Sequence, residues 1–255
     1  MQAETQYFID NNEHLKNHIG FLCIYGSNAH CTAIEGSDLD IRGFATPSTK
    51  DILFCEDFEQ VQTPFPDDVV IYSSNKFIRL LSNSNPNVIE WLGLKPEHYL
   101  QINDAGKLLL DNKKLFLSRD CIFTFGGYAK SQWRKLRGEE GGHSQRLNYL
   151  AHKGVARMSK HMMHLVRLEL TLCDLLEKEE IITYRPEREL LLDIRNGKFT
   201  GEDCKPIPAF YELVEEIEQR LDYAEKNSSL QAIPKYKEIR ELRMEINLNI
   251  LKEGV

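Results

Sequence analysis

Two aspartates that alternate with apolar residues follow a glycine-serine turn early in the chain, within the stretch GSNAHCTAIEGSDLDIRGF. The apolar residues directly before the turn, 20–25, have the length and composition of a buried strand. Side chains two residues apart in a strand point to the same side, so Asp38 and Asp40 project together from a second strand. Two parallel carboxylates repel each other unless a cation lies between them. The pattern therefore predicts two strands around a tight turn, with a cation site at the edge of a sheet.

The residue types in this stretch favour a phosphate ligand beside a divalent metal ion. A hard cation such as Mg²⁺ takes carboxylate oxygens as ligands and shares them with substrate phosphates. Gly26 lets the backbone approach a ligand closely, and Ser27 offers a hydroxyl and an N–H group to a phosphate oxygen. We therefore predict that Asp38 and Asp40 bind Mg²⁺, or Mn²⁺, beside a phosphate site formed by Gly26 and Ser27. This arrangement suits phosphoryl or nucleotidyl transfer.

A purely structural role for the same residues is the alternative. Ser37 and Asp38 can cap a helix, and a glycine-serine turn followed by an Asp-capped loop needs no ligand. A capping box requires Glu or Gln three residues after the cap, and neither Ser37 nor Asp38 has one there. The regular alternation of aspartates with apolar residues favours the extended, metal-binding interpretation.

The order of these features resembles the signature of the DNA polymerase β superfamily of nucleotidyltransferases. That signature is an apolar strand, Gly-Ser, a spacer of about ten residues, and Asp-x-Asp between apolar residues, as found here. Three segments are similar to a subgroup of YcgL-type and RNA-repair-associated RlaP-type proteins: SDLDIRGF, DDVVIYSSNKFIRLL and SNPNVIEWL. The superfamily motif covers the first third of the chain, and the resemblance to the subgroup continues into the helical remainder.

Members of the superfamily carry a third carboxylate on a neighbouring strand, and the resemblance implies one here. Asp68 is the predicted residue, because it opens an apolar, β-branched run over residues 68–72. Asp67 is the competing choice, and polar residues before a strand also act as turn formers. The predicted catalytic and metal-binding set is therefore Asp38, Asp40 and Asp68.

The second half of the chain contains a basic cluster within the run SKHMMHLVRL. Lys160, His164 and Arg167 are spaced i, i+4 and i+7, so they share one face of a helix. The subgroup shows a similar Lys-x-x-x-His-x-x-Arg arrangement, which implies that these residues reach the nucleotide phosphates or the acceptor. An ordinary solvated helix face is the alternative.

Two other groups of polar residues are candidates for nucleotide contacts. Ser131 and Gln132 resemble a recurrent Ser-Gln of the subgroup, and Lys135 can pair with phosphate as a point charge. A cap or bridge between helices is the alternative for Gln132. The second group can contact RNA or nucleotide, although a role in organising a turn between helices is favoured; it consists of Arg185, Arg188 and Arg195.

The pattern of elements predicts an α+β fold, with a small mixed sheet backed by helices and followed by a mainly α-helical C-terminal part. A chain of 255 residues exceeds a typical domain, so we expect a nucleotidyltransferase domain over 1–114 and a helical domain over 115–255. The first domain is expected to contain helices at 4–17, 29–35, from 74 onward and at 85–92, strands at 20–25, 38–44 and 68–72, and a small strand or turn at 51–56. The second is expected to contain helices at 122–136, 148–177, 209–226 and 235–251, with a glycine-rich break at 138–142.

Composition narrows the possible classes of protein. The net charge of −7 argues against coating of nucleic acid by bulk electrostatics, although basic residues concentrate over 130–167 and can form a local face for triphosphate or RNA. Six scattered cysteines without a Cys-x-x-C pair favour reduced structural thiols over a zinc or redox site. No apolar run is long enough to cross a bilayer, and the polar N-terminal segment is unlike a secretory signal, so we expect a cytoplasmic protein with no membrane partner.

The resemblance implies that a nucleoside triphosphate binds with Mg²⁺ and that an acceptor hydroxyl attacks its α-phosphate and expels pyrophosphate. An RNA end, such as that of tRNA, is the expected acceptor, because related proteins are associated with RNA ligation and repair systems. The first alternative is a nucleotidylating toxin or defence protein that modifies a protein or tRNA. The second is a non-catalytic nucleotide-binding module, which would not need the aspartate pair. The sequence favours no particular oligomeric state.

Overall fold

A five-stranded mixed sheet forms the centre of the N-terminal half in the computed structural model, which describes residues 1–64, 67–137 and 154–253. The strand order is β3-β4-β2-β1-β5, in which β2 and β4 run parallel and the other neighbours run antiparallel. The predicted α+β class is therefore confirmed. The strands are β1 (Ile19–Ile24), β2 (Asp40–Ala45), β3 (Gln60–Thr63), β4 (Asp68–Ser73) and β5 (Tyr99–Ile102).

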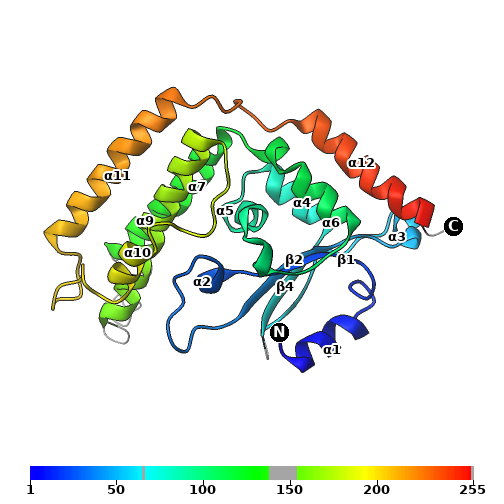
Figure 1. Cartoon of the computed structure of the whole chain (residues 1–255), viewed down its shortest axis with the longest axis horizontal. Coiled ribbons are helices and arrows are strands. Elements are labelled where there is room, and N and C mark those ends of the chain that lie inside the picture. Colours follow the sequence, from blue (N-terminus) through cyan, green and yellow to red (C-terminus); the bar gives the residue numbers. More distant parts are fainter. Residues whose placement is uncertain (65–66, 138–153, 254–255) are drawn as a thin grey trace.

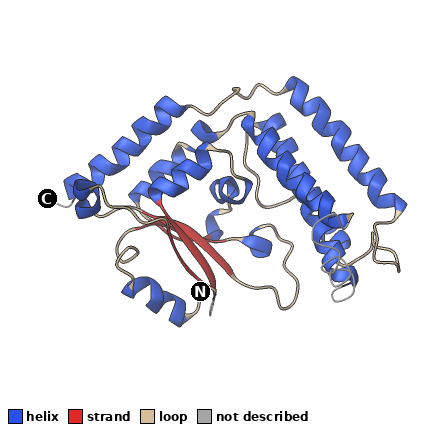
Figure 2. Cartoon of the chain, turned by 180° about the vertical axis from the view of Figure 1, so that it is seen from behind, coloured by secondary structure: helices blue, strands red, loops and turns tan. Residues whose placement is uncertain are grey.

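Helices cover both faces of this sheet (Figures 1 and 2). Residues alternate along β2, so that Ile41 packs with Ile9 of α1 (Ala3–Asn11) on one face. Phe44 packs on the opposite face, with its ring stacked 4.8 Å from that of Phe77 in α4. The helices near this second face are α4 (Ser74–Ser82), α5 (Pro86–Ile89) and α6 (Asp104–Asp111).

The C-terminal half is helical, and its longest helix lies at its centre. This helix, α9 (Gly154–Lys178), contacts α7 (Asp120–Leu136), α10 (Arg188–Arg195) and α11 (Pro208–Asn227). The last helix, α12 (Tyr236–Glu253), returns to the N-terminal half and contacts α3, α4 and α6 (Figure 1). The remaining short elements are α2 (Gly26–Ala29), α3 (Thr49–Phe54), η1 (Glu90–Gly93), η2 (Pro96–His98) and η3 (Lys113–Phe116).

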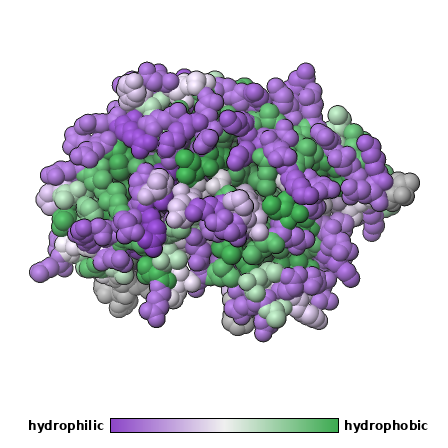
Figure 3. Space-filling model, viewed as in Figure 1, coloured by the Kyte–Doolittle hydropathy of each residue, from purple (hydrophilic) through white to green (hydrophobic). Residues whose placement is uncertain are grey.

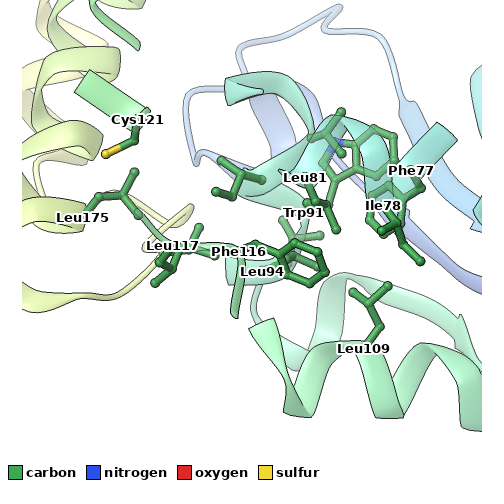
Figure 4. Close-up of a cluster of buried hydrophobic side chains, with 14 of the residues drawn as sticks. Phe77, Ile78, Leu81, Trp91, Leu94, Leu109, Phe116, Leu117, Cys121 and Leu175 are labelled. Atoms are coloured by element: carbon green, nitrogen blue, oxygen red, sulfur yellow. The ribbon is translucent and has the colours of Figure 1, made fainter. Parts of the chain in front are cut away.

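One continuous apolar core joins the two halves of the chain. Phe77 and Trp91 lie in it near the sheet, and Phe116 is buried next to them (Figure 4). The same cluster continues to Cys121 of α7 and Leu175 of α9, which lie toward its other end (Figure 4). Because buried side chains are packed at high density, this core fixes how the helices of the second half sit against the sheet.

Several expected elements differ from those observed. The helix expected at 29–35 is wrong: the helical turn is α2, which begins at Gly26 itself. The segment 51–56 belongs mostly to helix α3 rather than to a strand or turn, because Ser48 and Asp51 form a reciprocal capping box. Strands β3 and β5 were not expected, and the first helix ends at Asn11 rather than at residue 17. The expected break at 138–142 and the first turns of the helix expected at 148–177 lie outside the described residues.

The surface is mixed in polarity. On the face shown in Figure 3, hydrophilic residues follow the outer edge, where α11 and α12 lie, and apolar areas lie nearer the middle. Within the described residues, no helix combines the length and apolar character needed to cross a membrane. The six cysteines are free, as expected for structural thiols.

A buried carboxyl group on α9 makes folding sensitive to pH. Glu169 is only 5% exposed, and its Oε2 atom makes no hydrogen bond. Burial raises the pKa of Glu169 to about 8, and the nearby carboxylate of Glu218 on α11 adds to the rise. The folded state therefore holds a proton on Glu169 over a pH range in which the unfolded chain has released it.

We predict that Glu169→Gln removes part of the pH dependence of stability. In the wild type, stability from protonated Glu169 is fully present below the pKa of an ordinary glutamate and is lost as the pH rises through about 8. The loss is at most about 1.4 kcal/mol per pH unit for one group. Urea unfolding of both proteins between about pH 5 and pH 8 measures this loss of stability. Equal slopes for the two proteins would contradict the assignment.

Candidate active site

Three aspartates gather at one edge of the sheet because two parallel strands begin there together. Asp40 is the first residue of β2 and is paired in register with Asp68, the first residue of β4. Residues paired in this way project to the same face of a sheet. Asp38 lies two residues before the start of β2 and is exposed. The predicted strand at 38–44 thus starts two residues later than expected.

A guanidinium group lies between two of these carboxylates. Arg42 Nη2 donates hydrogen bonds to Asp40 Oδ1 and to Asp68 Oδ2, each at 2.8 Å. Burial raises the pKa of Asp40, Arg42 opposes this rise, and the carboxylates of Asp68 and Asp38 add to it. Among the described residues, no three His, Cys, Asp or Glu side chains are arranged to hold a metal ion.

The donor set nevertheless fits a hard divalent cation. It consists of carboxylate oxygens only, which suit Mg²⁺ better than nitrogen or sulfur ligands do. The guanidinium of Arg42 lies between Asp40 and Asp68, so positive charge is stabilised at this position, and Asp38 carries a third, exposed carboxylate two residues before Asp40.

Asp67 has a different environment from its neighbour. It is 3% exposed, and its Oδ2 accepts hydrogen bonds from the Gln2 backbone at 2.9 Å and from the Thr5 hydroxyl at 2.7 Å. Burial raises the pKa of Asp67, but these hydrogen bonds outweigh burial and hold the pKa below its ordinary value. Asp67 therefore anchors α1 to the start of β4, whereas Asp68 faces Asp40.

The glycine of the predicted turn lies directly against the carboxylate of Asp40. Gly26 has a φ of +61°, and a Cβ atom at this position would lie 1.9 Å from Asp40 Oδ2. No other residue fits here without displacing Asp40, so the close approach requires glycine. Ser27 follows in α2 and lines the same cavity as Asp38 and Asp40.

A cavity of about 510 Å³ lies between this sheet edge and the helical half of the chain. Its volume is in the range of pockets that hold a nucleotide-sized ligand. In Figure 1, α2 faces α9, the helix that supplies most of the lining on the other side, with further residues from α7 and α10. The predicted site residues that line this cavity are Gly26, Ser27, Asp38, Asp40, Gln132, Lys160, His164 and Arg167.

Other predicted residues lie elsewhere. Ser131 lines a neighbouring hollow with Tyr128 and Pro86, and neither Lys135 nor Asp68 lines the cavity. Gln132 lines the cavity and also links α7 to α9, because its Oε1 lies 2.8 Å from His161 Nδ1. The bridging alternative for Gln132 and its place at the cavity are therefore compatible.

Glu90 is a buried glutamate that bonds to two residues of the cavity lining, and the sequence analysis did not single it out. Glu90 is 1% exposed and accepts hydrogen bonds from Tyr25 Oη at 2.6 Å and from Arg167. Burial raises the pKa of Glu90, but Arg167, His30 and the bond from Tyr25 outweigh it, so the pKa is lowered. The signal in the sequence was a single charged residue within the apolar run VIEWL, which requires a buried partner.

The two histidines near this network are neutral at pH 7. Burial lowers the pKa of His30 to about 4, with Arg167 as the second cause. Burial also lowers the pKa of His164 well below its ordinary value, and the charges of Arg167 and Lys160 lower it further. His164 can therefore offer a hydrogen bond to a ligand, and the positive charge of the cavity comes from its lysine and arginines.

Comparison with known proteins identifies the family of this chain. Residues 2–245 match the family model RlaP, described as an RNA repair pathway DNA polymerase beta family, and the chain belongs to this family. No curated protein matches it significantly. Among solved structures, it is similar to a nucleotidyltransferase-like protein from Exiguobacterium sibiricum, with 13% identity and a TM-score of 0.29 over 98% of this chain and 78% of that chain.

We predict that loss of Asp67 destabilises the protein more than loss of its neighbour Asp68. Asp67→Ala leaves the buried Thr5 hydroxyl and the Gln2 N–H group without their acceptor, which costs about 1–3 kcal/mol of the free energy of unfolding. Asp68→Ala removes a side chain that is 45% exposed, so its cost is below about 1 kcal/mol. Urea unfolding of the two variants measures the difference. A larger cost for Asp68→Ala than for Asp67→Ala would refute the assignment.

Proposed function

We propose that this protein is a Mg²⁺-dependent nucleotidyltransferase that transfers a nucleoside monophosphate from a nucleoside triphosphate to a hydroxyl acceptor, with an RNA end such as that of tRNA as the acceptor. The main support is the position of Asp38 and Asp40 beside Gly26 and Ser27 in one cavity. Membership of a DNA polymerase β-type family of an RNA repair pathway agrees with this proposal.

The carboxylates of Asp38, Asp40 and Asp68 are the proposed holders of Mg²⁺ or Mn²⁺. When bound, divalent ions supply neutralisation of phosphate charge and a lowered pKa for the attacking hydroxyl. In the absence of metal ions, Arg42 balances the negative charge of Asp40 and Asp68, which keeps β2 and β4 paired at this edge.

The remaining residues bind and orient the triphosphate. The Gly26 backbone allows a phosphate to approach Asp40, and Ser27 offers its hydroxyl and N–H group as donors. Lys160 supplies a positive charge from the helical half. His164, being neutral, contributes a hydrogen bond rather than a charge.

Membership of an RNA repair family supports RNA as the proposed acceptor. The cavity is lined by Asp38 from the sheet side and by residues of α9 from the helical half, so we propose that the acceptor end and the triphosphate both bind there. Transfer to a protein hydroxyl uses the same carboxylates, and the labelling experiment below distinguishes the two acceptors.

We predict that Asp38→Asn and Asp40→Asn each reduce transfer of label from an α-³²P nucleoside triphosphate to RNA by about 100-fold or more, because each variant removes a ligand that stabilises the transition state. The assay mixes purified protein, Mg²⁺, each of the four α-labelled triphosphates and total cellular RNA. Glu35→Gln is the matched control, because it removes a carboxylate that lines the same cavity but lies in the segment between α2 and β2, and we expect it to retain most of the activity.

Label on protein instead of RNA would identify the nucleotidylating alternative. Retention of triphosphate without release of pyrophosphate would identify a binding module. Equal labelling by the wild type and by Asp40→Asn would exclude the proposed site.

A further inference from the structure

An arginine on α10 has an environment that its role in a turn between helices does not explain. The other two arginines of this region are paired: Arg185 is fully buried against Asp174 and Glu187, and Arg188 bonds to Glu189 on the surface. Arg195 lines the main cavity, and no ion pair joins it to any described residue. The contacts of Arg185 agree with a role in the turn between helices, Arg188 is an exposed surface residue, and Arg195 differs from both.

One nitrogen of the half-buried Arg195 side chain is shielded and has no hydrogen-bond partner. The Nε atom is buried and makes no hydrogen bond, and burial lowers the pKa of this side chain. A buried donor without an acceptor is costly, and because Arg195 lines a cavity, a ligand that enters this cavity can supply the acceptor. Arg167 has the same feature, because its Nε is also buried and unsatisfied although its Nη1 bonds to Glu90.

Arg195 and Lys160 line the same cavity, and the segment that follows α10 contacts the start of α9. A Cβ atom on Gly197 would lie 2.9 Å from Val155 and 3.7 Å from Ser159 Oγ. The hydroxyls of Ser159 and Thr200 lie 2.9 Å apart and join the two segments further. Two basic side chains from two helices thus line the cavity, and neither forms an ion pair within the described residues.

We propose that Arg195, together with Lys160, binds the terminal phosphates of the nucleoside triphosphate. This inference rests on the proposed function and adds a residue that no family motif assigned. The carboxylates of Asp38 and Asp40 lie on the sheet side of the same cavity, so a triphosphate between the two sides meets cations on α9 and α10. A guanidinium binds phosphate oxygens in a two-pronged geometry that lysine does not reproduce.

The triphosphate is favoured over the acceptor as the source of this phosphate. The Nε of Arg195 is buried, so its acceptor must enter the cavity, whereas the phosphates of an RNA chain run along a surface. Arg167 is held by Glu90, which leaves Arg195 as the guanidinium of this cavity that has no carboxylate partner among the described residues.

The test is equilibrium binding of α,β-methylene analogues of the four common ribonucleoside triphosphates, with Mg²⁺, compared with the matching monophosphates. We expect Arg195→Gln to weaken the affinity for the triphosphate by roughly 10-fold to 100-fold and to leave that for the monophosphate unchanged. Arg195→Lys retains part of the affinity, because it keeps the positive charge but cannot form the two-pronged hydrogen bonds of a guanidinium. Arg188→Gln, which removes a charge from the same helix outside the cavity, binds like the wild type.

Thermal unfolding separates this role from a structural one. Because Arg195 makes no hydrogen bond through Nε and no ion pair with a described residue, we expect Arg195→Gln to unfold at a temperature no lower than that of the wild type.

Equal triphosphate affinity of Arg195→Gln and the wild type would overturn the inference, as would equal loss of triphosphate and monophosphate affinity. A weaker apparent affinity for RNA with unchanged triphosphate binding would assign Arg195 to the acceptor and overturn it too. If the wild type binds none of the four triphosphates, the proposed function itself fails.

Discussion

The in-register pairing of two parallel strands, β2 and β4, is the constraint on which the candidate site depends. It places the first residues of the strands, Asp40 and Asp68, side by side, with Asp38 just before them. Burial raises the pKa of Asp40, and the neighbouring carboxylates of Asp68 and Asp38 raise it further, so a cation is needed to balance their charge. Arg42 provides that charge, and Gly26 is required because Asp40 leaves no room for a side chain.

A second interaction determines how the helical half faces this edge. Glu90, in the 3₁₀ turn η1, bonds to Arg167 of α9, so the ion pair links the two parts of the chain at the cavity. Its neighbour Trp91 stacks on Phe77 at 5.4 Å and on Tyr72 at 5.5 Å, which fixes η1 against the sheet. A buried ion pair adds little to stability compared with apolar residues, but loss of one partner leaves a buried charge that costs about 3–5 kcal/mol. The pair is therefore better suited to fixing geometry than to stabilising the fold.

The parts of the fold that follow from local patterns were predictable from the sequence. The helices α7, α11 and α12 were predicted to within two residues at most ends, because long amphipathic patterns define them. Strand β3 was missed because its residues are largely polar, as edge strands often are. Helix α3 was missed because its capping box uses Asp51 in place of glutamate or glutamine.

The residues of the candidate site also fall into those that a local sequence pattern indicates and those that it does not. Asp38, Asp40 and the glycine-serine turn form a contiguous motif, so the sequence indicated them directly. The choice between Asp67 and Asp68 depends on strand register and on contacts with α1, which no local pattern contains. Glu90 depends on a partner 77 residues away, and the cavity position of Arg195 depends on how α10 docks on α9. These features come from tertiary packing rather than from spacing.

The most direct test of the account is a crystal structure of the protein with Mn²⁺ and a non-hydrolysable nucleoside triphosphate, in which anomalous scattering locates the metal. The account predicts a Mn²⁺ ion at about 2.1 Å from carboxylate oxygens of Asp38 and Asp40, with the phosphates beside Gly26 and Ser27 and Arg42 moved away from Asp40. A triphosphate bound outside this cavity, or Arg42 still between Asp40 and Asp68 with no metal at the sheet edge, would contradict it.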